Sequence, residues 1–504
     1  MSLSDYVLFL LGFMGVYWAL WILFTVWLHP YSKYPGPFLA SISRLWLVLE
    51  VFQGHAHITQ KSLHEKLGPI VRIAPNEVSI SDPEFIKVIY GVNSGFTKTD
   101  FYLSFRPKFA RFPDLFTTIN EKVHSQRRKI VNNIYSMTSI VKSEDLIDIC
   151  SELFLQRIGE FAETKNPVDI AKWVNWYTFD VIGELYFSSM FGFMKERQDS
   201  HNYIASLDNC LPIVCASGVL PKYIRIPFLF SGLLFSPIRS AMHALSAINQ
   251  AAETSVTDRI QLREKGNSTR EDILDKLLCI YESRGDEQDF TVTDIQVEAY
   301  GGFFAGSDTT AAAISSILFH IIKNPVVYSK LMKEIDEASA AGNLSYPHVK
   351  YAEAMRLPYL IACCKEGMRI HPSIGMTLPR VVPPGGRQIL GQWFPGGLRV
   401  GVNAAVVHFD KGIFGGDANE FNPERWLRGD TANMDRHMFQ FGSGSRICIG
   451  KNISLCEIHK FVPELLRTYE IKLANPDAEF VTVNHWFNKP CPLQVNVKRR
   501  AIGV

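Results

Sequence analysis

One loop governs the interpretation of this chain: Phe441-Gly442-Ser443-Gly444-Ser445-Arg446-Ile447-Cys448-Ile449-Gly450. A single cysteine stands among glycines and serines, with a cation two residues before it. Small residues allow backbone N–H groups to approach a thiolate closely, and the segment after Gly450 predicts a helix whose N-terminus favours an anionic sulfur. The alternative is a buried cysteine in a glycine-rich turn, because free cysteine usually packs as a small hydrophobe. The pattern favours a metal-ligating thiolate.

The order Phe441-x-x-Gly444-x-Arg446-x-Cys448-x-Gly450 resembles the haem-ligand loop of the cytochrome P450 family, the haem-thiolate monooxygenases. The resemblance extends over nearly the whole chain, from about Pro35 to the C-terminus. It implies haem b (iron protoporphyrin IX) as the cofactor and Cys448 as the axial ligand of its iron. It also implies that Phe441 shields the sulfur and that Arg446 meets an anion beside it. Thiolate ligation favours O–O cleavage in that family.

Length and composition fit a single large catalytic unit. The chain has 504 residues, of which 47% are apolar, and its net charge of +2 gives no reason to expect nucleic acid. Its nine cysteines show no zinc spacing and no regular disulfide framework, which favours a reducing compartment.

The N-terminus predicts a membrane anchor. No charged residue occurs from Tyr6 to Leu28, and about 20 apolar residues suffice to span a bilayer. A secretory signal peptide is the rival interpretation, but it would begin with a basic region, whereas Asp5 is the only early charge. Lys33 and Arg44 follow the span, so we expect the catalytic part to face the cytosol.

These features predict three segments: a membrane anchor (1–30), a proline-rich hinge (31–44) and a catalytic domain (45–504). We expect a single-pass protein of the endoplasmic reticulum membrane. Helical spacing dominates, and alternating patterns are short, so the fold class is mainly α with a small β lobe, as in the cytochrome P450 fold. Helices are expected at 45–67, 144–161, 168–186, 237–264 and 272–282, and strands at 69–75, 77–80, 387–389, 398–402 and 480–497.

A long helix is predicted from Asp294 to Lys323, opened by a capping box at Thr293-x-x-Gln296. Its middle contains Gly301, Gly302, Gly306 and a threonine pair, which are poor helix formers, and a flat cofactor pressed on the backbone would explain the glycines.

The hexapeptide from Ala305 to Thr310 in this helix resembles the oxygen-activation motif of the family. The resemblance implies that Ala305 lies at the cofactor, that Thr309 hydrogen-bonds the oxygen being activated and that Asp308 delivers protons. We expect the Thr309 hydroxyl to face the pocket rather than the carbonyl one turn earlier. A kinked core helix with a satisfied Asp308 is the alternative.

Two further motifs match the family. Glu366 and Arg369 lie three residues apart on a predicted helix. The second motif, Pro423-Glu424-Arg425-Trp426, lies between this helix and the cysteine loop. The resemblance implies a buried triad of Glu366, Arg369 and Arg425 that fixes the cysteine loop. An exposed ion pair between Glu366 and Arg369 would contribute under about 1 kcal/mol.

Propionate contacts are implied for three side chains: His124, Arg128 and Arg380. His124 and Arg128 lie four residues apart on one helix face. Arg127 is the alternative to Arg128 if the register is shifted by one residue. A charge-rich exposed helix and an ordinary strand entry are the structural alternatives.

The resemblance implies a monooxygenase that inserts one oxygen atom from O₂ into a lipophilic small molecule. A separate NADPH–cytochrome P450 reductase is expected, with cytochrome b5 as an optional donor, because no dinucleotide fingerprint follows a strand. Details such as Lys451-Asn452-Ile453-Ser454 resemble fungal secondary-metabolism members near pisatin demethylase and the benzoate hydroxylases. Candidate pocket walls are Phe101, Phe105, Phe112, Phe116, Phe303, Phe304, Ile374, Met376, Trp486 and Phe487, with substrate choice expected in 207–234.

Two other functions stay open at this point. One is a haem-thiolate enzyme that couples or desaturates its substrate without inserting oxygen. The other is a non-catalytic haem-binding membrane protein, against which the presence of both Asp308 and Thr309 argues.

Overall fold

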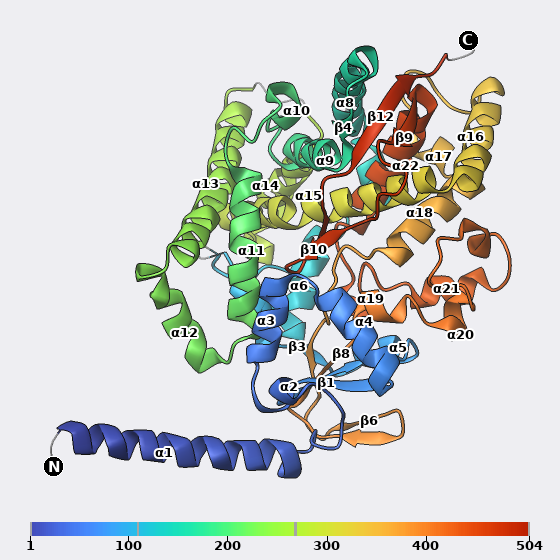
Figure 1. The fold of residues 1–504 in the computed structure, drawn as a ribbon. Helices are drawn as coiled ribbons and strands as arrows, with labels where there is room; N and C mark the ends of the chain where they lie inside the picture. The colour runs from blue at the N-terminus through green and yellow to red at the C-terminus, as the bar shows by residue number, and fades with distance from the viewer. Residues whose placement is uncertain (1–2, 108–109, 267–269, 502–504) are drawn as a thin grey trace.

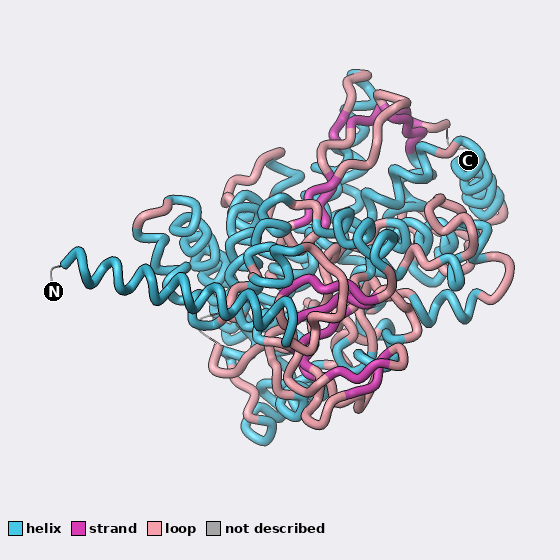
Figure 2. The backbone as a smooth tube through the Cα atoms, turned by 60° about the horizontal axis from the view of Figure 1, so that its bottom comes forward, coloured by secondary structure: helices cyan, strands magenta, loops and turns pink. Residues whose placement is uncertain are grey.

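A computed structural model describes residues 3–107, 110–266 and 270–501, and the chain is mainly α-helical with short strands in small sheets (Figures 1 and 2). This agrees with the predicted fold class. Most of the expected helices and strands are present with shifted ends. The strand region expected at 480–497 is three short strands at 482–484, 488–490 and 494–499. The helix expected at 45–67 is two helices, α3 (Leu45–Gln53) and α4 (Ala56–Leu67). Gly54 separates them with φ of +72°, a conformation that ends a helix readily.

The N-terminal helix α1 (Leu3–Leu23) continues into a π-helical turn, η1 (Phe24–Leu28), and projects from the body of the molecule in both views (Figures 1 and 2). The helix segment Ser4–Leu28 is long and apolar enough to cross a membrane, and none of its most apolar part is buried. An exposed apolar helix of this length fits a bilayer rather than water.

The hinge that follows is packed rather than loose. Pro35 O accepts a hydrogen bond from Arg72 N at 2.7 Å, and the Tyr34 ring stacks on Phe394 at 5.5 Å. A Cβ on Gly36 would lie 2.1 Å from Arg72 O, so only glycine permits this approach. These contacts attach the base of the anchor to the β lobe.

The β lobe lies at the end of the body nearest α1 (Figure 1). Its sheet has the order β1-β2-β8-β5-β3, in which β2 and β8 are parallel and the other pairs are antiparallel. The members are β1 (Ile70–Ala74), β2 (Glu77–Ile80), β8 (Arg399–Gly401), β5 (Arg380–Val381) and β3 (Thr97–Lys98). The sheet thereby brings Lys98 opposite Arg380 in register.

The remaining strands form three small sheets. They are β4 (Val168–Asp169), β12 (Gln494–Arg499) and β9 (Tyr469–Leu473) in one sheet, β6 (Arg387–Ile389) with β7 (Gln392–Phe394), and β10 (Thr482–Asn484) with β11 (Asn488–Pro490).

The helix α15 (Val292–Lys323) crosses the middle of the molecule (Figure 1). It packs against α9 (Ile170–Tyr186), α18 (Pro358–Ile370), α22 (Lys451–Thr468) and β11. Its capping box is formed by Thr291 and Asp294, so the prediction of Thr293 and Gln296 was wrong. The Asp294 carboxylate accepts hydrogen bonds from both the backbone N–H and the hydroxyl of Thr291 at 2.8 Å, and a carboxylate at a helix N-terminus is also favoured by the helix dipole.

Two glycines of α15 allow the close approach of α9. A Cβ on Gly302 would lie 2.8 Å from the Tyr186 ring, and one on Gly306 would lie 2.6 Å from Ile182 Cδ1, both on α9. A Cβ on Gly301 would meet nothing within 4 Å. All three glycines also line a cavity beside α15, so the expectation that a flat cofactor explains them stays a prediction.

The other helices surround this centre. They are α2 (Phe38–Ile42), α5 (Phe85–Tyr90), η2 (Asp100–Phe105), α6 (Glu121–Val131), α7 (Met137–Val141), α8 (Glu144–Thr164), α10 (Phe193–Glu196), α11 (Tyr203–Val219), α12 (Lys222–Phe230), η3 (Ser231–Leu233), α13 (Ser236–Glu264), α14 (Ile273–Gln288), α16 (Pro325–Ala340), α17 (Tyr351–Ala354), α19 (Ala404–Val407), α20 (Lys411–Phe414), η4 (Pro423–Trp426), α21 (Thr431–His437) and η5 (Gly444–Arg446).

Candidate active site

The cysteine loop holds its thiol among backbone donors. Cys448 N donates to Phe441 O at 2.8 Å, which closes the loop just before α22. Burial raises the pKa of the Cys448 thiol, while the N–H groups of Gly450 and Lys451 and the nearby Arg128 oppose that rise. Gly444 has φ of +65°, and a Cβ there would lie 1.9 Å from Tyr90 O. The glycine is thus required for the loop to seat against the end of α5.

A cavity of about 310 Å³ lies between this loop and α15. Cys448 lines one side, and the stripe Gly301, Ala305 and Thr309 lines the other at helical spacing. Ala305 and Cys448 belong to interior segments, and both side chains are exposed to this cavity. The thiol and the helix stripe therefore share one enclosed space.

The predicted cationic residues also gather around this space. His124, Arg128, Arg380 and Arg446 all line the cavity. Arg128 donates to Ile447 O at 2.7 Å, whereas Arg127 turns away and donates to Asp289 O at 2.7 Å. The register with Arg128 is therefore the one that reaches the cavity.

The partners of these cations leave room for a bound anion. Arg446 pairs with Glu121 at 2.8 Å, yet its buried Nη1 has no hydrogen-bond partner among the described residues. Arg380 Nη1 donates to the Tyr102 hydroxyl at 2.8 Å. Burial, together with the nearby Arg446, lowers the pKa of His124 to about 3, so the ring is neutral. Buried charges of one sign without full compensation indicate a missing anionic group.

Lys98 is a cavity-lining cation that the sequence analysis missed. It is buried, donates to Phe116 O at 2.6 Å and lies 4.5 Å from the Tyr102 ring centre. Burial and the nearby Arg380 lower its pKa well below the ordinary value. No motif marks this lysine, because only the pairing of β3 with β5 brings it beside Arg380.

These residues fit iron protoporphyrin IX. The thiol of Cys448 offers a soft ligand to iron, the Gly301–Ala305–Thr309 stripe carries no bulky side chain, and the cations with the orphaned Arg446 Nη1 suit two carboxylates. Phe441 lines the same cavity beside the thiol, as expected for a shield.

Thr309 and Asp308 differ from their predicted geometry. The Thr309 hydroxyl donates to Ala305 O at 2.8 Å, so the expectation that it would leave this carbonyl is wrong in this structure, although Thr309 does line the cavity. Backbone bonding of this kind is the usual choice of a helical threonine, and it leaves the hydroxyl oxygen able to accept a hydrogen bond. Asp308 is buried on another face of α15, where it pairs with Lys489 Nζ at 3.0 Å.

Aromatic side chains form the rest of the wall. Phe105, Phe116, Phe304, Trp486 and Phe487 line the cavity, as do Ile374 and Met376. Several of these rings meet edge to face, such as Phe105 and Phe116 at 5.4 Å between centres. Such a lining favours an apolar ligand.

Three predicted wall residues lie elsewhere. Phe303 packs on Phe179 in the core, Phe112 lies under the Arg127 guanidinium, and Phe101 contacts Gly218 of α11. Along α15, Phe303 and Phe304 point in different directions, so only one of them can face the cavity. Among the described residues that line the cavity, none comes from 207–234, so any effect of that segment on substrate choice is indirect.

The triad residues are joined as predicted. Glu366 accepts from Arg369 at 2.7 and 2.8 Å and from Arg425 Nε at 3.0 Å, and all three side chains are buried. Trp426 Nε1 adds a hydrogen bond to Glu366 at 2.8 Å, which the sequence analysis did not foresee.

A histidine connects this network to the cysteine loop. Arg369 Nη1 donates to His408 O at 2.8 Å, and Phe439 N donates to His408 Nε2 at 2.7 Å. Burial lowers the pKa of His408 to about 3, so its Nδ1 carries the proton and donates to Arg369 O. His408 had no distinguishing signal in the sequence, since its partners lie 31 and 39 residues away.

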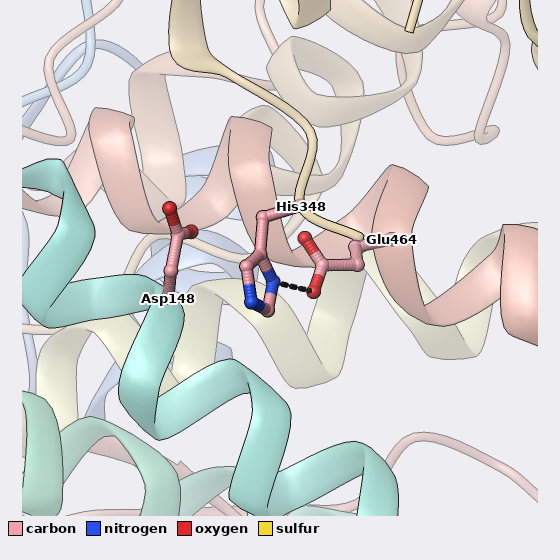
Figure 3. Close-up of side chains that lie close together, drawn as sticks. All are labelled: Asp148, His348 and Glu464. Atoms are coloured by element: carbon pink, nitrogen blue, oxygen red, sulfur yellow. Dashed lines mark hydrogen bonds and ion pairs between the residues drawn. The ribbon is translucent and has the colours of Figure 1, made fainter. Parts of the chain in front are cut away.

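A second polar cluster lies away from this cavity. Asp148 of α8, His348 and Glu464 of α22 converge within 4.8 Å, and His348 Nδ1 lies 2.9 Å from Glu464 Oε1 (Figure 3). Lys460 Nζ, which is fully buried, already lies 2.9 Å from Asp148 and also bonds to Val349 O. An ammonium in this position supplies the positive charge that a metal would bring, so the cluster is a buried ion-pair network that joins α8 to α22.

The fold and this cavity together define a mainly α protein with a cysteine thiol facing a central helix across an apolar, cation-rimmed cavity. The family model described as Cytochrome P450 matches residues 35–496, and the chain belongs to the cytochrome P450 family. Membership implies an oxidoreductase with a haem-thiolate cofactor, a redox partner and a small-molecule substrate.

Its relatives include fungal monooxygenases. The chain is 40% identical to the cytochrome P450 monooxygenase gsfF of Penicillium aethiopicum, over 98% of this chain and 100% of that protein. It is 35% identical to the cytochrome P450 monooxygenase cicH of Emericella nidulans, over 93% and 94% of the two chains. It is 33% identical to pisatin demethylase of Fusarium vanettenii, over 94% and 90%. The predicted resemblance to fungal members near pisatin demethylase is confirmed.

The buried triad generates a prediction about folding. Glu366→Gln or Arg425→Ala should lower the free energy of unfolding by about 3–5 kcal/mol, because each leaves a buried charge without its partner. We expect little haem-loaded protein from either variant, measured as haem absorbance per mole of purified chain.

The matched control is Glu337→Gln, which breaks the exposed Lys333–Glu337 pair at 3.8 Å. An exposed pair of this kind contributes about 0.3–0.5 kcal/mol, so haem loading should be unchanged. Normal haem content in both triad variants would contradict the role assigned to Glu366.

Proposed function

We propose that this protein is a haem-thiolate monooxygenase that inserts one oxygen atom from O₂ into a lipophilic small molecule, an intermediate of fungal secondary metabolism. The observation that carries the proposal is the placement of Cys448 and the Gly301–Ala305–Thr309 stripe on opposite sides of one cavity. The names of the relatives support a monooxygenase of this kind.

Cys448 would hold haem b through its sulfur, and Arg128, Arg380, Arg446, His124 and Lys98 would surround the cofactor carboxylates. When bound, the haem supplies O₂ activation, which thiolate ligation favours. The chain itself contributes orientation and exclusion of water: aromatic rings close the wall, and apolar enclosure strengthens every polar contact inside.

Thr309 is proposed to accept and donate hydrogen bonds at the cavity, and Asp308 to supply protons to the same turn of α15. The Thr309–Ala305 hydrogen bond can be exchanged at low cost, because a net hydrogen bond contributes about 0.5–1.5 kcal/mol.

Oxidative coupling or desaturation would use the same cavity. The mass of the product distinguishes these reactions from oxygen insertion, which adds one oxygen atom.

We propose three segments: a membrane anchor (1–30), a hinge (31–44) and a catalytic domain (45–504). The anchor holds the protein in the endoplasmic reticulum membrane, with the catalytic domain in the cytosol. NADPH–cytochrome P450 reductase supplies the electrons to the haem, with cytochrome b5 as an optional donor. The uncovered helix Ser4–Leu28 supports the anchor. The helix α12 lies on the α1 side of the molecule (Figure 1), and a second apolar surface, formed by exposed side chains around α12, supports a membrane-facing orientation. This surface includes Tyr223 at 79%, Phe230 at 66%, Leu233 at 77% and Leu234 at 84% exposure.

The Thr309 hydroxyl should control how much NADPH ends in product. We expect Thr309→Ala to retain haem and substrate binding but to lower product formed per NADPH several-fold, with the electrons appearing as peroxide or water. The reason is that the Thr309 hydroxyl lies in the cavity-lining stripe, where it can donate and accept a proton. The measurement compares NADPH consumed, product and peroxide.

Ser316→Ala is the matched control, since it removes a buried hydroxyl of the same helix that does not line the cavity. This hydroxyl donates a hydrogen bond to Gly367 O at a distance of 3.0 Å. Equal coupling in Thr309→Ala, Ser316→Ala and the natural protein would refute the role of Thr309.

Membrane attachment should require both apolar surfaces. Deleting residues 1–30 should release much of the protein while its haem spectrum persists, and adding Phe230→Ser, Leu233→Ser and Leu234→Ser should release the remainder, because together they remove the exposed anchor helix and three strongly exposed apolar side chains near α12. The measurement is the soluble fraction after centrifugation of membranes. Val326→Ser, at a similarly exposed position of 77%, is the control in the truncated protein. Full membrane retention of the combined variant would contradict this assignment.

A further inference from the structure

A lysine lies between two carboxylates beside the middle of α15. Lys489 Nζ is 3.0 Å from Asp308 Oδ1 and 2.5 Å from Asp208 Oδ1. The side chain of Asp308 is 1% exposed, that of Lys489 is 23% exposed and that of Asp208 is 49% exposed. Lys489 of β11 therefore connects a buried carboxylate of α15 with a surface carboxylate of α11.

Asp308 depends on this lysine for its charge compensation. Its Oδ1 also accepts a hydrogen bond from Asn175 Nδ2 at 2.8 Å, whereas its buried Oδ2 has no hydrogen-bond partner in the part of the chain that the structure describes. Burial would lower the pKa of Lys489, but Asp308 and Asp208 outweigh burial and raise it. The lysine is therefore charged, and removing it would leave Asp308 as an uncompensated buried anion.

The segment directly before the strand that carries Lys489 contributes to the wall of the cavity. Trp486 and Phe487 of this segment line the cavity. Trp486 has φ of +110°, which is unfavourable for a bulky residue, and such strain is concentrated at ligand-contacting positions.

The same strand is tied to the turn of α15 at Thr309. Asn488 N donates to Ser373 O at 2.9 Å, and Ser373 Oγ donates to Thr309 O at 2.6 Å. These two hydrogen bonds join the segment that follows the aromatic wall to the turn that carries Asp308 and Thr309.

We propose that Lys489 is a positioning residue for the oxygen insertion: its ammonium fixes the Asp308 carboxylate next to Thr309, and β11 couples that position to the aromatic wall of the cavity. Asp208 holds the lysine from the surface side. Lys489 itself is not among the described cavity-lining residues, so it acts through Asp308. The proposal rests on the proposed function.

The test is a double-mutant cycle of Lys489→Met and Asp308→Asn in the full-length, haem-loaded protein. Each single change should lower product per NADPH several-fold, and the double variant should be no worse than Asp308→Asn alone, because both remove the same pair. The shifts in unfolding temperature, followed by circular dichroism, should be non-additive in the same way. Lys489→Arg should restore most of the coupling, since arginine keeps the charge.

Lys472→Met, at a side chain 75% exposed on β9, is the matched control and should change neither readout. If Lys489→Met fails to load haem, Lys489→Gln, which keeps a hydrogen-bond donor, replaces it in the cycle. Additive effects in the cycle, or unchanged coupling in the lysine variant, would overturn the proposal. If the unsubstituted protein shows no haem-thiolate spectrum, the proposed function is contradicted instead. The double-mutant cycle of unfolding temperatures would still test the ion pair between Lys489 and Asp308.

Discussion

One buried carboxylate supports the whole cysteine side of the molecule. Glu366 accepts hydrogen bonds from Arg369, Arg425 and Trp426, so a single side chain joins α18 to η4. From Arg369 the connection passes through His408 to Phe439 N, and Cys448 N then closes on Phe441 O. Such a network is stable only when every member is satisfied, since an unpaired charge in this interior would cost several kcal/mol.

The opposite side of the cavity depends on small residues of α15. Gly302 and Gly306 admit the side chains of α9, and together with Gly301, Ala305 and Thr309 they line the cavity without bulk. The same helix therefore packs tightly against α9 and also leaves room for a flat ligand. Its Asp308 is buried and accepts a hydrogen bond from Asn175 of α9, and Lys489 from a distant strand balances its charge.

The sequence predicted the features that depend on local spacing and missed those that depend on tertiary pairing. Cys448, the long central helix, the apolar anchor and the Glu366–Arg369 pair follow from motifs and periodicity. Lys98 and His408 could not be found in this way, because strand pairing and a hydrogen bond across 31 residues bring them into place. The capping box was misplaced by two residues because Thr291 and Thr293 are equivalent as caps until the backbone of the first turn is known. Phe303 was wrongly placed on the cavity because a one-residue step rotates a helical side chain to another face.

The central claim is that the Cys448 sulfur is the axial ligand of a haem iron in this cavity. It is tested most directly by the difference spectrum of the reduced, carbon monoxide-bound protein, compared between the natural chain and Cys448→Ala, with Cys456→Ala as the control for a buried cysteine of α22. The account predicts the Soret band that gives the family its name in the natural chain and in Cys456→Ala, and no such band in Cys448→Ala. A band of normal position and intensity in Cys448→Ala would contradict it, because another residue would then hold the iron.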